Sequence, residues 1–154
     1  MEIVQVDKTN YAIFNRCNGI RKFCDYNIPK ICSPFGLEEF NKITYLNLEL
    51  DNGISYHSQL LGDIYKVEKE LYEYMRTING SLEWVSSIKK KDGFNPLWKI
   101  RIQKRRGRYM IKSSSAFHEI DFKHDIKIKV ILQSVWIYQE KCGAIYYLDE
   151  VEQI

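Results

Sequence analysis

The sequence has little proline, no long apolar run and no secretion signal, and each absence excludes a class of protein. Only three of its 154 residues are proline, whereas 45% are hydrophobic and 14% are aromatic, so the composition is that of a folded chain and not of a disordered one. Nothing approaches the ~18 consecutive apolar residues of a membrane-spanning helix. The opening MEIVQVDKTNYAIF lacks the basic start and apolar run of a signal peptide, which predicts an intracellular, non-secreted protein.

Cysteine pairs of the CxxC kind are also absent. The four cysteines are Cys17, Cys24, Cys32 and Cys142. Together with the three histidines, they match no zinc-finger or zinc-ribbon spacing. A chain of this length can fill a core without disulfides, so we expect small buried thiols, no structural metal and no cofactor.

Catalytic signatures are missing as well: the sequence holds no GxSxG, Walker glycine loop, HExxH or GxGxxG. A polar stretch with His118, Glu119, Asp121, His124 and Asp125 offers groups for a divalent cation or an acid/base pair. Its spacing fits neither a helical face nor a strand face, which favours a solvated loop. We therefore expect a protein that is not an enzyme, and a metal-dependent enzyme is the weakest alternative.

Hydrophobic periodicity predicts one amphipathic helix at about residues 59–78, ended by Asn79 and Gly80. Its apolar positions fall at steps of three and four: Leu60, Ile64, Val67, Leu71, Tyr74, Met75 and Ile78. Its opposite, polar face is expected to carry Glu68, Lys69, Glu70, Glu73 and Arg76. Alternating segments predict strands at 42–50, 98–103, 108–112, 126–136 and 144–148. The sequence therefore predicts one domain over residues 1–154, mainly β with an inserted helix, in the form of a small barrel.

The net charge of +3 is distributed unevenly. Residues 1–84 carry nine basic and twelve acidic side chains, whereas residues 85–141 carry fourteen basic and five acidic ones. This asymmetry indicates a polyanion as the partner of the later region.

The segment KIRIQKRRGRYMIK, residues 99–112, concentrates that charge: seven of its fourteen residues are Lys or Arg. Strand alternation directs Trp98, Ile100 and Ile102 inward, and Arg105-Arg106-Gly107 predicts a turn. If the strands at 98–103, 108–112 and 126–136 are neighbours, their bases share one face. The predicted phosphate contacts are Lys99, Arg101, Lys104, Arg105, Arg106, Arg108, Lys112, Lys127 and Lys129.

Aromatic residues near this basic region are candidates for stacking on bases. They are Phe94, Trp98, Tyr109 and Tyr138. Alternation places Trp98 and Tyr109 inward, so both are core residues first and stacking residues second. An ordinary solvated sheet surface is the competing interpretation of the basic face.

Four segments follow an order that resembles a known family. They are CSPFGL at 32–37, YLNLEL at 45–50, LWKIRIQ at 97–103 with the basic hairpin, and IKVILQSVWIY at 128–138 followed by GAIYYL at 143–148. This order is similar to the OB-fold single-stranded-DNA-binding proteins of large nucleocytoplasmic DNA viruses, relatives of the phage replication type. The resemblance implies a β-barrel that coats single-stranded DNA during viral replication, recombination or repair, and it favours DNA over RNA as the ligand, although phosphate contacts and stacking serve either polymer. It also implies a place in the host cytoplasm, viral factory or nucleus, with replication proteins or further copies of itself as partners.

One feature departs from the family. Replicative relatives often end in a flexible acidic tail with a terminal aromatic residue, whereas LDEVEQI at 148–154 resembles the end of a strand. The main alternative function is a non-enzymatic virion protein whose basic strip contacts packaged DNA or an acidic partner.

Overall fold

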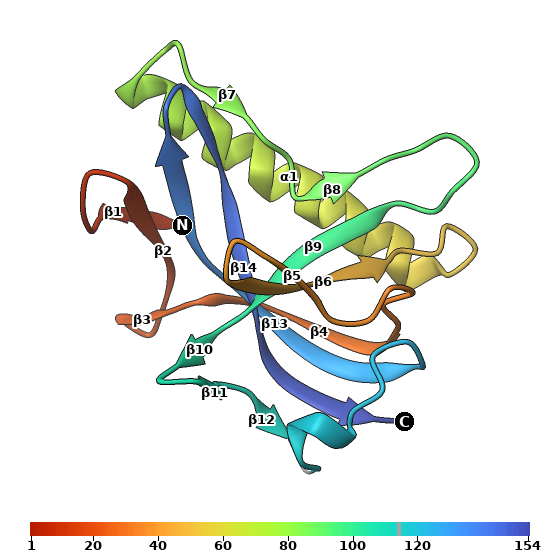
Figure 1. Ribbon diagram of the computed structural model, residues 1–154. Helices are drawn as coiled ribbons and strands as arrows, with labels where there is room; N and C mark the ends of the chain where they lie inside the picture. The colour runs from red at the N-terminus through yellow and green to blue at the C-terminus, as the bar shows by residue number, and fades with distance from the viewer. Residues whose placement is uncertain (114) are drawn as a thin grey trace. The chain divides into compact units, whose positions relative to one another are not determined.

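The computed structural model describes residues 1–113 and 115–154, and its fold is mainly β with one helix (Figure 1). This confirms the predicted class. Most strands of the described residues form a large sheet that does not close into a barrel, so the predicted OB-like barrel is not confirmed. The chain divides into two compact units. The first unit comprises Met1–Cys24, Asp51–Ser87 and Leu132–Ile145, and the second comprises Asp25–Leu50, Ile88–Ile131 and Tyr146–Ile154.

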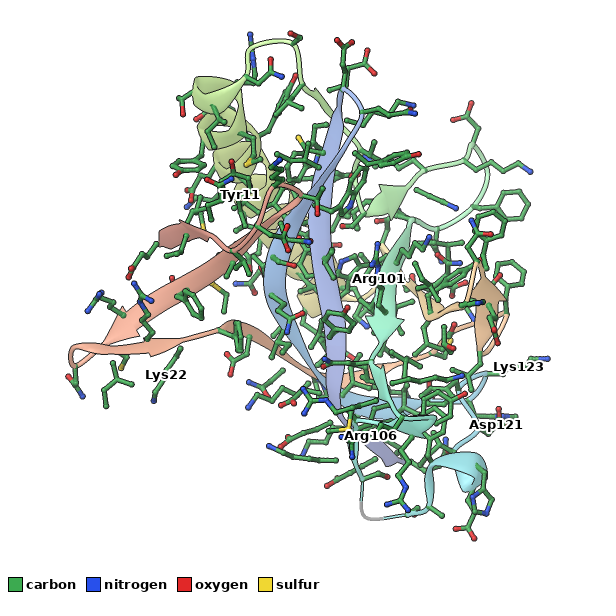
Figure 2. The ribbon with its side chains drawn as sticks, turned by 60° about the vertical axis from the view of Figure 1, so that its left-hand side comes forward. Tyr11, Lys22, Arg101, Arg106, Asp121 and Lys123 are labelled. Atoms are coloured by element: carbon green, nitrogen blue, oxygen red, sulfur yellow. The ribbon has the colours of Figure 1, made fainter. Side chains whose placement is uncertain are left out.

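The first unit combines the helix with short and long strands. Its elements are β1 (Glu2–Gln5), β2 (Asn10–Cys17), β3 (Ile20–Lys22), α1 (Ser55–Ile78) and β7 (Glu83–Trp84). It also contains the last part of β13 (Ile126–Tyr138) and the first part of β14 (Lys141–Gln153). Strand β2 pairs antiparallel with β1, β3 and β13, and β7 pairs parallel with β14. Lys22 lies in the hairpin of β2 and β3, which projects outward in Figure 2.

Helix α1 begins at Ser55, four residues before the predicted start, and ends at Ile78 as predicted. Leu60, Ile64, Leu71 and Met75 are buried and Val67 is half-buried, so the predicted apolar face is confirmed in part. Tyr74 and Ile78 are exposed, and their placement on that face was wrong. The helix also buries two residues outside the predicted apolar set, His57 and Glu68. The prediction that placed Glu68 on the polar face is therefore wrong. No helix in the described part of the chain combines the length and apolarity that crossing a membrane requires.

Hydrogen bonds explain why the polar side chains of His57 and Glu68 can be buried. The Asp51 backbone N–H donates to His57 Nδ1 at 3.0 Å. The Glu68 carboxylate accepts hydrogen bonds from Trp84 Nε1 at 3.0 Å, from Ser86 Oγ at 3.3 Å, and from the backbone N–H of Ser87 at 3.2 Å; the Ser87 hydroxyl donates to it too. A buried polar group is tolerated where such partners exist, and Glu68 therefore anchors the segment that follows β7.

The second unit consists mainly of short strands, and some of them pair with β9. Its elements are β4 (Cys24–Ile31), β5 (Glu38–Phe40), β6 (Ile43–Glu49), β8 (Ile88–Lys89), β9 (Leu97–Ile102), β10 (Lys104–Arg105), β11 (Arg108–Tyr109), β12 (Lys112–Ser113) and the 3₁₀ helix η1 (Phe117–Glu119), together with the remaining parts of β13 and β14. Strands β5, β6 and β9 pair antiparallel in that order. Strand β9 also pairs antiparallel with β8 and parallel with β14, at Arg101 and Tyr147.

The core of the second unit contains an aromatic cluster. The Trp98 ring, fully buried, makes edge contacts with Tyr26 and Tyr146 at centroid distances of 5.7 and 5.1 Å. Leu46 and Ile100, which pair across β6 and β9, are also fully buried. These contacts position the outward side chains of β9, because alternate residues of a strand point to opposite faces.

The long strand β13 follows the predicted alternation only in part. Ile126, Ile128, Val130 and Leu132 are buried as predicted, but the next fully buried side chain is Val135, and Trp136 is half-buried. The inward positions therefore shift by one residue after Leu132. Residues 148–154 were predicted to resemble the end of a strand, and this is confirmed, since β14 continues to Gln153.

The four cysteines differ in exposure. Cys142 is buried, Cys24 and Cys32 are half-buried, and Cys17 is exposed, so the expectation of small buried thiols holds for Cys142 and is wrong for Cys17. Burial also raises the pKa of the Cys142 thiol to about 11. The thiolate is the reactive form, so burial and this shift act together against modification of Cys142.

We expect iodoacetamide at about pH 8, near the ordinary cysteine pKa, to alkylate Cys17 in the folded protein and to leave Cys142 unmodified. Mass spectrometry of the digested protein measures both sites. Because the raised pKa belongs to the folded state, folding stability should fall as pH rises from the ordinary thiol range toward about 11. Equal labelling rates for Cys142 and Cys17 would contradict the expectation.

Candidate nucleic-acid interface

The most basic part of the sequence forms a hairpin at the predicted turn, but the predicted returning strand at 108–112 is divided into β11 and β12. Strands β10 and β11 pair as a separate two-stranded ribbon, with Lys104 opposite Tyr109 and Arg105 opposite Arg108. Arg106 and Gly107 have φ of 53° and 76°, so they form a two-residue turn with left-handed backbone at both positions. Next to the ribbon, the Met110 N–H donates a hydrogen bond of 2.8 Å to the Gln103 carbonyl. Figure 2 shows Arg106 at its end.

Strand β9 supplies the second group of cations. Trp98, Ile100 and Ile102 are buried, as predicted, while Lys99 and Arg101 are half-buried on the opposite face. The alternation of β9 therefore confirms which residues face outward.

The Lys and Arg residues of segment 99–112 also share an electrostatic property. Among the residues that the structure describes, no carboxylate lies within 4.0 Å of any Lys or Arg of segment 99–112. Lys99 Nζ lies instead over the Tyr45 ring at 4.4 Å, and Lys104 Nζ over the Tyr109 ring at 4.6 Å. Partial burial lowers the pKa of Lys99; the neighbouring charges of Lys89 and Arg101 lower it further, and Glu38 opposes them. In the described part of the chain, the cations of this segment therefore form no ion pair with a carboxylate.

Lys127 and Lys129 have a different environment. Strand β14 lies between β9 and β13 in the sheet. The prediction that the strands at 98–103 and 126–136 are neighbours, and that their bases share one face for that reason, is therefore wrong. Lys129 Nζ lies 3.6 Å from Asp25 and 3.9 Å from Asp149. Both lysines line a hollow of about 260 Å³, and Glu150 and Glu152 line it too. Acidic neighbours thus balance Lys129, and Lys127 shares the lining of the hollow with Glu150 and Glu152.

Lys112 is placed apart from the hairpin as well. It lies on β12, which pairs with β14 opposite Glu150. Of the nine predicted phosphate contacts, the structure therefore groups six on β9 and the hairpin. These are Lys99, Arg101, Lys104, Arg105, Arg106 and Arg108.

The candidate stacking residues also separate into two groups. Phe94 is 70% exposed and Tyr138 is 69% exposed, so both present an open ring. Tyr109 is half-buried and stacks on Phe117 with a centroid distance of 4.0 Å. Trp98 is fully buried and has no ring face open to a base. Because of this burial, the prediction that Trp98 stacks on bases is wrong.

The structure adds basic and aromatic residues that the sequence pattern did not reveal. Asn41 and Lys42 have φ of 49° and 64° and form a second two-residue turn, between β5 and β6. A hollow of about 260 Å³ is lined by Lys42, Arg101 and Lys104, together with parts of Ile43, Thr44, Ile102, Gln103 and Tyr147. The paired Phe40 and Ile43 at the turn are exposed. The asparagine before Lys42 was the available turn signal.

The side chains considered for a metal site, Asp121, His124 and Asp125, contact other side chains of the protein. Asp121 Oδ2 lies 2.6 Å from His124 Nδ1, and this hydrogen bond is the main cause that lowers the pKa of Asp121. Asp125 lies 3.4 Å from Lys30. Within residues 1–113 and 115–154, no three His, Cys, Asp or Glu side chains gather at a spacing that could hold a metal ion. Asp121 and Lys123 are labelled near η1 in Figure 2.

The resemblance to viral single-stranded-DNA-binding proteins remains a prediction. No protein-family model matches this sequence, and no curated protein or solved structure matches the chain.

Proposed function

We propose that this protein binds single-stranded nucleic acid without sequence preference, through β9 and the β10–β11 hairpin. The observation that carries the proposal is the absence of any carboxylate partner for the cations of segment 99–112 in the described part of the chain. Like charges held this close repel one another, and a phosphate backbone removes the repulsion while releasing its own counterions.

Exposed aromatic residues favour single strands over duplex as the ligand. Phe94 and Phe40 are 70% and 68% exposed, and both belong to the second unit. Proteins that bind single strands combine a basic surface with such rings, and the combination tolerates any sequence because every base has a π face. The sequence resemblance suggests viral DNA replication, recombination or repair as the process.

A competition experiment tests the proposal. Fluorescence anisotropy would compare a labelled oligothymidylate, an RNA of the same length and a duplex, in salt from about 50 to 200 mM, the range over which phosphate-dominated affinities fall steeply. We expect the single strands to bind best and the logarithm of the affinity to fall linearly with the logarithm of the salt concentration. Undetectable binding at low salt would refute the proposal, and equal affinity for duplex would favour the virion-protein alternative.

A further inference from the structure

One face of the sheet in the second unit carries a row of side chains that the strand register defines. Tyr45 on β6 lies opposite Glu38 on β5 and opposite Arg101 on β9, and Arg101 lies opposite Tyr147 on β14. The row thus places an arginine between two tyrosines on three adjacent strands. Residues directly opposite each other on paired strands point to the same face of the sheet, so each tyrosine is a neighbour of Arg101.

Alternation shows that this row faces away from the core. The residues beside it on β6 and β9, Leu46 and Ile100, are fully buried, whereas Tyr45, Arg101 and Tyr147 are half-buried. Their rings and guanidinium are therefore partly accessible to solvent. We call Tyr45, Lys99, Arg101 and Tyr147 the tyrosine–arginine face.

The surroundings of this face are basic and hollowed. Lys99 Nζ lies 4.4 Å from the centre of the Tyr45 ring. The hollow of about 260 Å³ adjoins the row at Arg101 and Tyr147, with Lys42 and Lys104 at its rim. The one carboxylate of the row, on Glu38, accepts a hydrogen bond from Asn47 Nδ2 at 2.7 Å.

We propose that the tyrosine–arginine face is where the bases of a bound single strand stack. This inference rests on the proposed function and deepens it, because it assigns the bases to the sheet face and the phosphates to the surrounding cations. Tyrosine rings offer stacking surface, and a guanidinium stacks on bases through its own plane. Lys99, now over Tyr45, would leave the ring for a phosphate when a base takes its place.

The chemistry of the face also selects the ligand. Cations alone can bind phosphate, whereas the two tyrosine rings beside Arg101 add an aromatic surface on which a base can stack and a phosphate cannot. A duplex keeps its bases stacked inside, whereas a single strand presents them to aromatic side chains. Both DNA and RNA single strands satisfy this requirement.

Tyr147 variants test the inference. Replacing Tyr147 with leucine removes the ring, and we expect the affinity for oligothymidylate to fall about tenfold, whereas Tyr147→Phe should keep it. An abasic sugar-phosphate oligomer of the same length should bind all three proteins equally, because it lacks bases. Tyr74→Leu, an exposed tyrosine on α1, is the matched control and should leave both affinities unchanged.

Several outcomes overturn the inference. If folded Tyr147→Leu keeps full affinity for oligothymidylate while removal of the hairpin arginines abolishes it, the proposed function stands and the base-stacking face is refuted. An equal loss for the abasic oligomer also refutes it. If no oligomer binds the wild-type protein, both proposals fall. Circular dichroism checks folding, and Tyr45→Leu provides a second variant if Tyr147→Leu does not fold.

A cross-linking experiment gives an independent measurement. Irradiation of the complex with an oligonucleotide that carries 5-iododeoxyuridine should attach it to a peptide containing Tyr45 or Tyr147. Attachment only at Phe94 or Tyr138 would place the bases elsewhere and refute the inference.

Discussion

Removing the three arginines of the hairpin should lower the affinity for oligothymidylate about 100-fold at 0.1 M salt. The variant Arg105→Ala, Arg106→Asn, Arg108→Ala achieves this, with asparagine at position 106 because it tolerates the left-handed backbone there. For single strands, each phosphate contact contributes a salt slope of about 0.7, which corresponds to about 0.7 powers of ten in affinity at 0.1 M salt. Three contacts therefore give about two powers of ten, and the slope itself should fall by about 2. Anisotropy across a salt series measures both.

The matched control removes three cations elsewhere. Lys8, Lys66 and Lys69 are exposed residues of the first unit, and replacing them with alanine changes the net charge by the same amount. We expect a much smaller loss of affinity for this variant. Equal losses in the two variants would show that binding follows the total charge of the protein and not the hairpin.

The largest expected effect on stability belongs to Glu68. Glu68→Ala should lower the free energy of unfolding by about 3 kcal/mol, because it removes the buried carboxylate that accepts hydrogen bonds from Trp84, Ser86 and Ser87. The melting temperature should fall by roughly 6–12 °C for a chain of this size. Urea denaturation and thermal melts followed by circular dichroism measure these changes.

Two companion variants make the Glu68 result specific. Glu70 lies exposed on the same helix, and Glu70→Ala should change the stability by no more than about 0.5 kcal/mol. Glu68→Gln keeps one acceptor oxygen and should fall between the two. If Glu68→Ala were as stable as Glu70→Ala, the carboxylate would not anchor the segment after β7.

The sequence predicted the helix and strands better than it predicted which of them lie next to one another. Local periodicity correctly identified α1, the inward residues of β9 and the turn at Gly107, since each depends on residues close together in the chain. Glu68 was misassigned because its charge was given more weight than its position. It lies four residues after Ile64 and three before Leu71, within the buried stripe of the helix.

The candidate site was only partly predictable for a different reason. The cations of the hairpin are contiguous in the sequence, so their pattern was visible. The order of the strands is not local: β14 comes last in the chain, yet it lies between β9 and β13. Tyr45, Arg101 and Tyr147 are therefore neighbours only after long-range pairing, which no local pattern in one sequence reveals.

The register of the hairpin has a consequence for how the protein senses its surroundings. Arg105 lies directly opposite Arg108, so the ribbon folds against the repulsion of its own charges. Under the proposed function, added salt screens that repulsion and stabilises the free ribbon, while the same salt weakens binding to a phosphate chain. Folding of the hairpin and binding should then respond to ionic strength in opposite directions. A bound polyanion would stabilise the folded hairpin, because it binds that state.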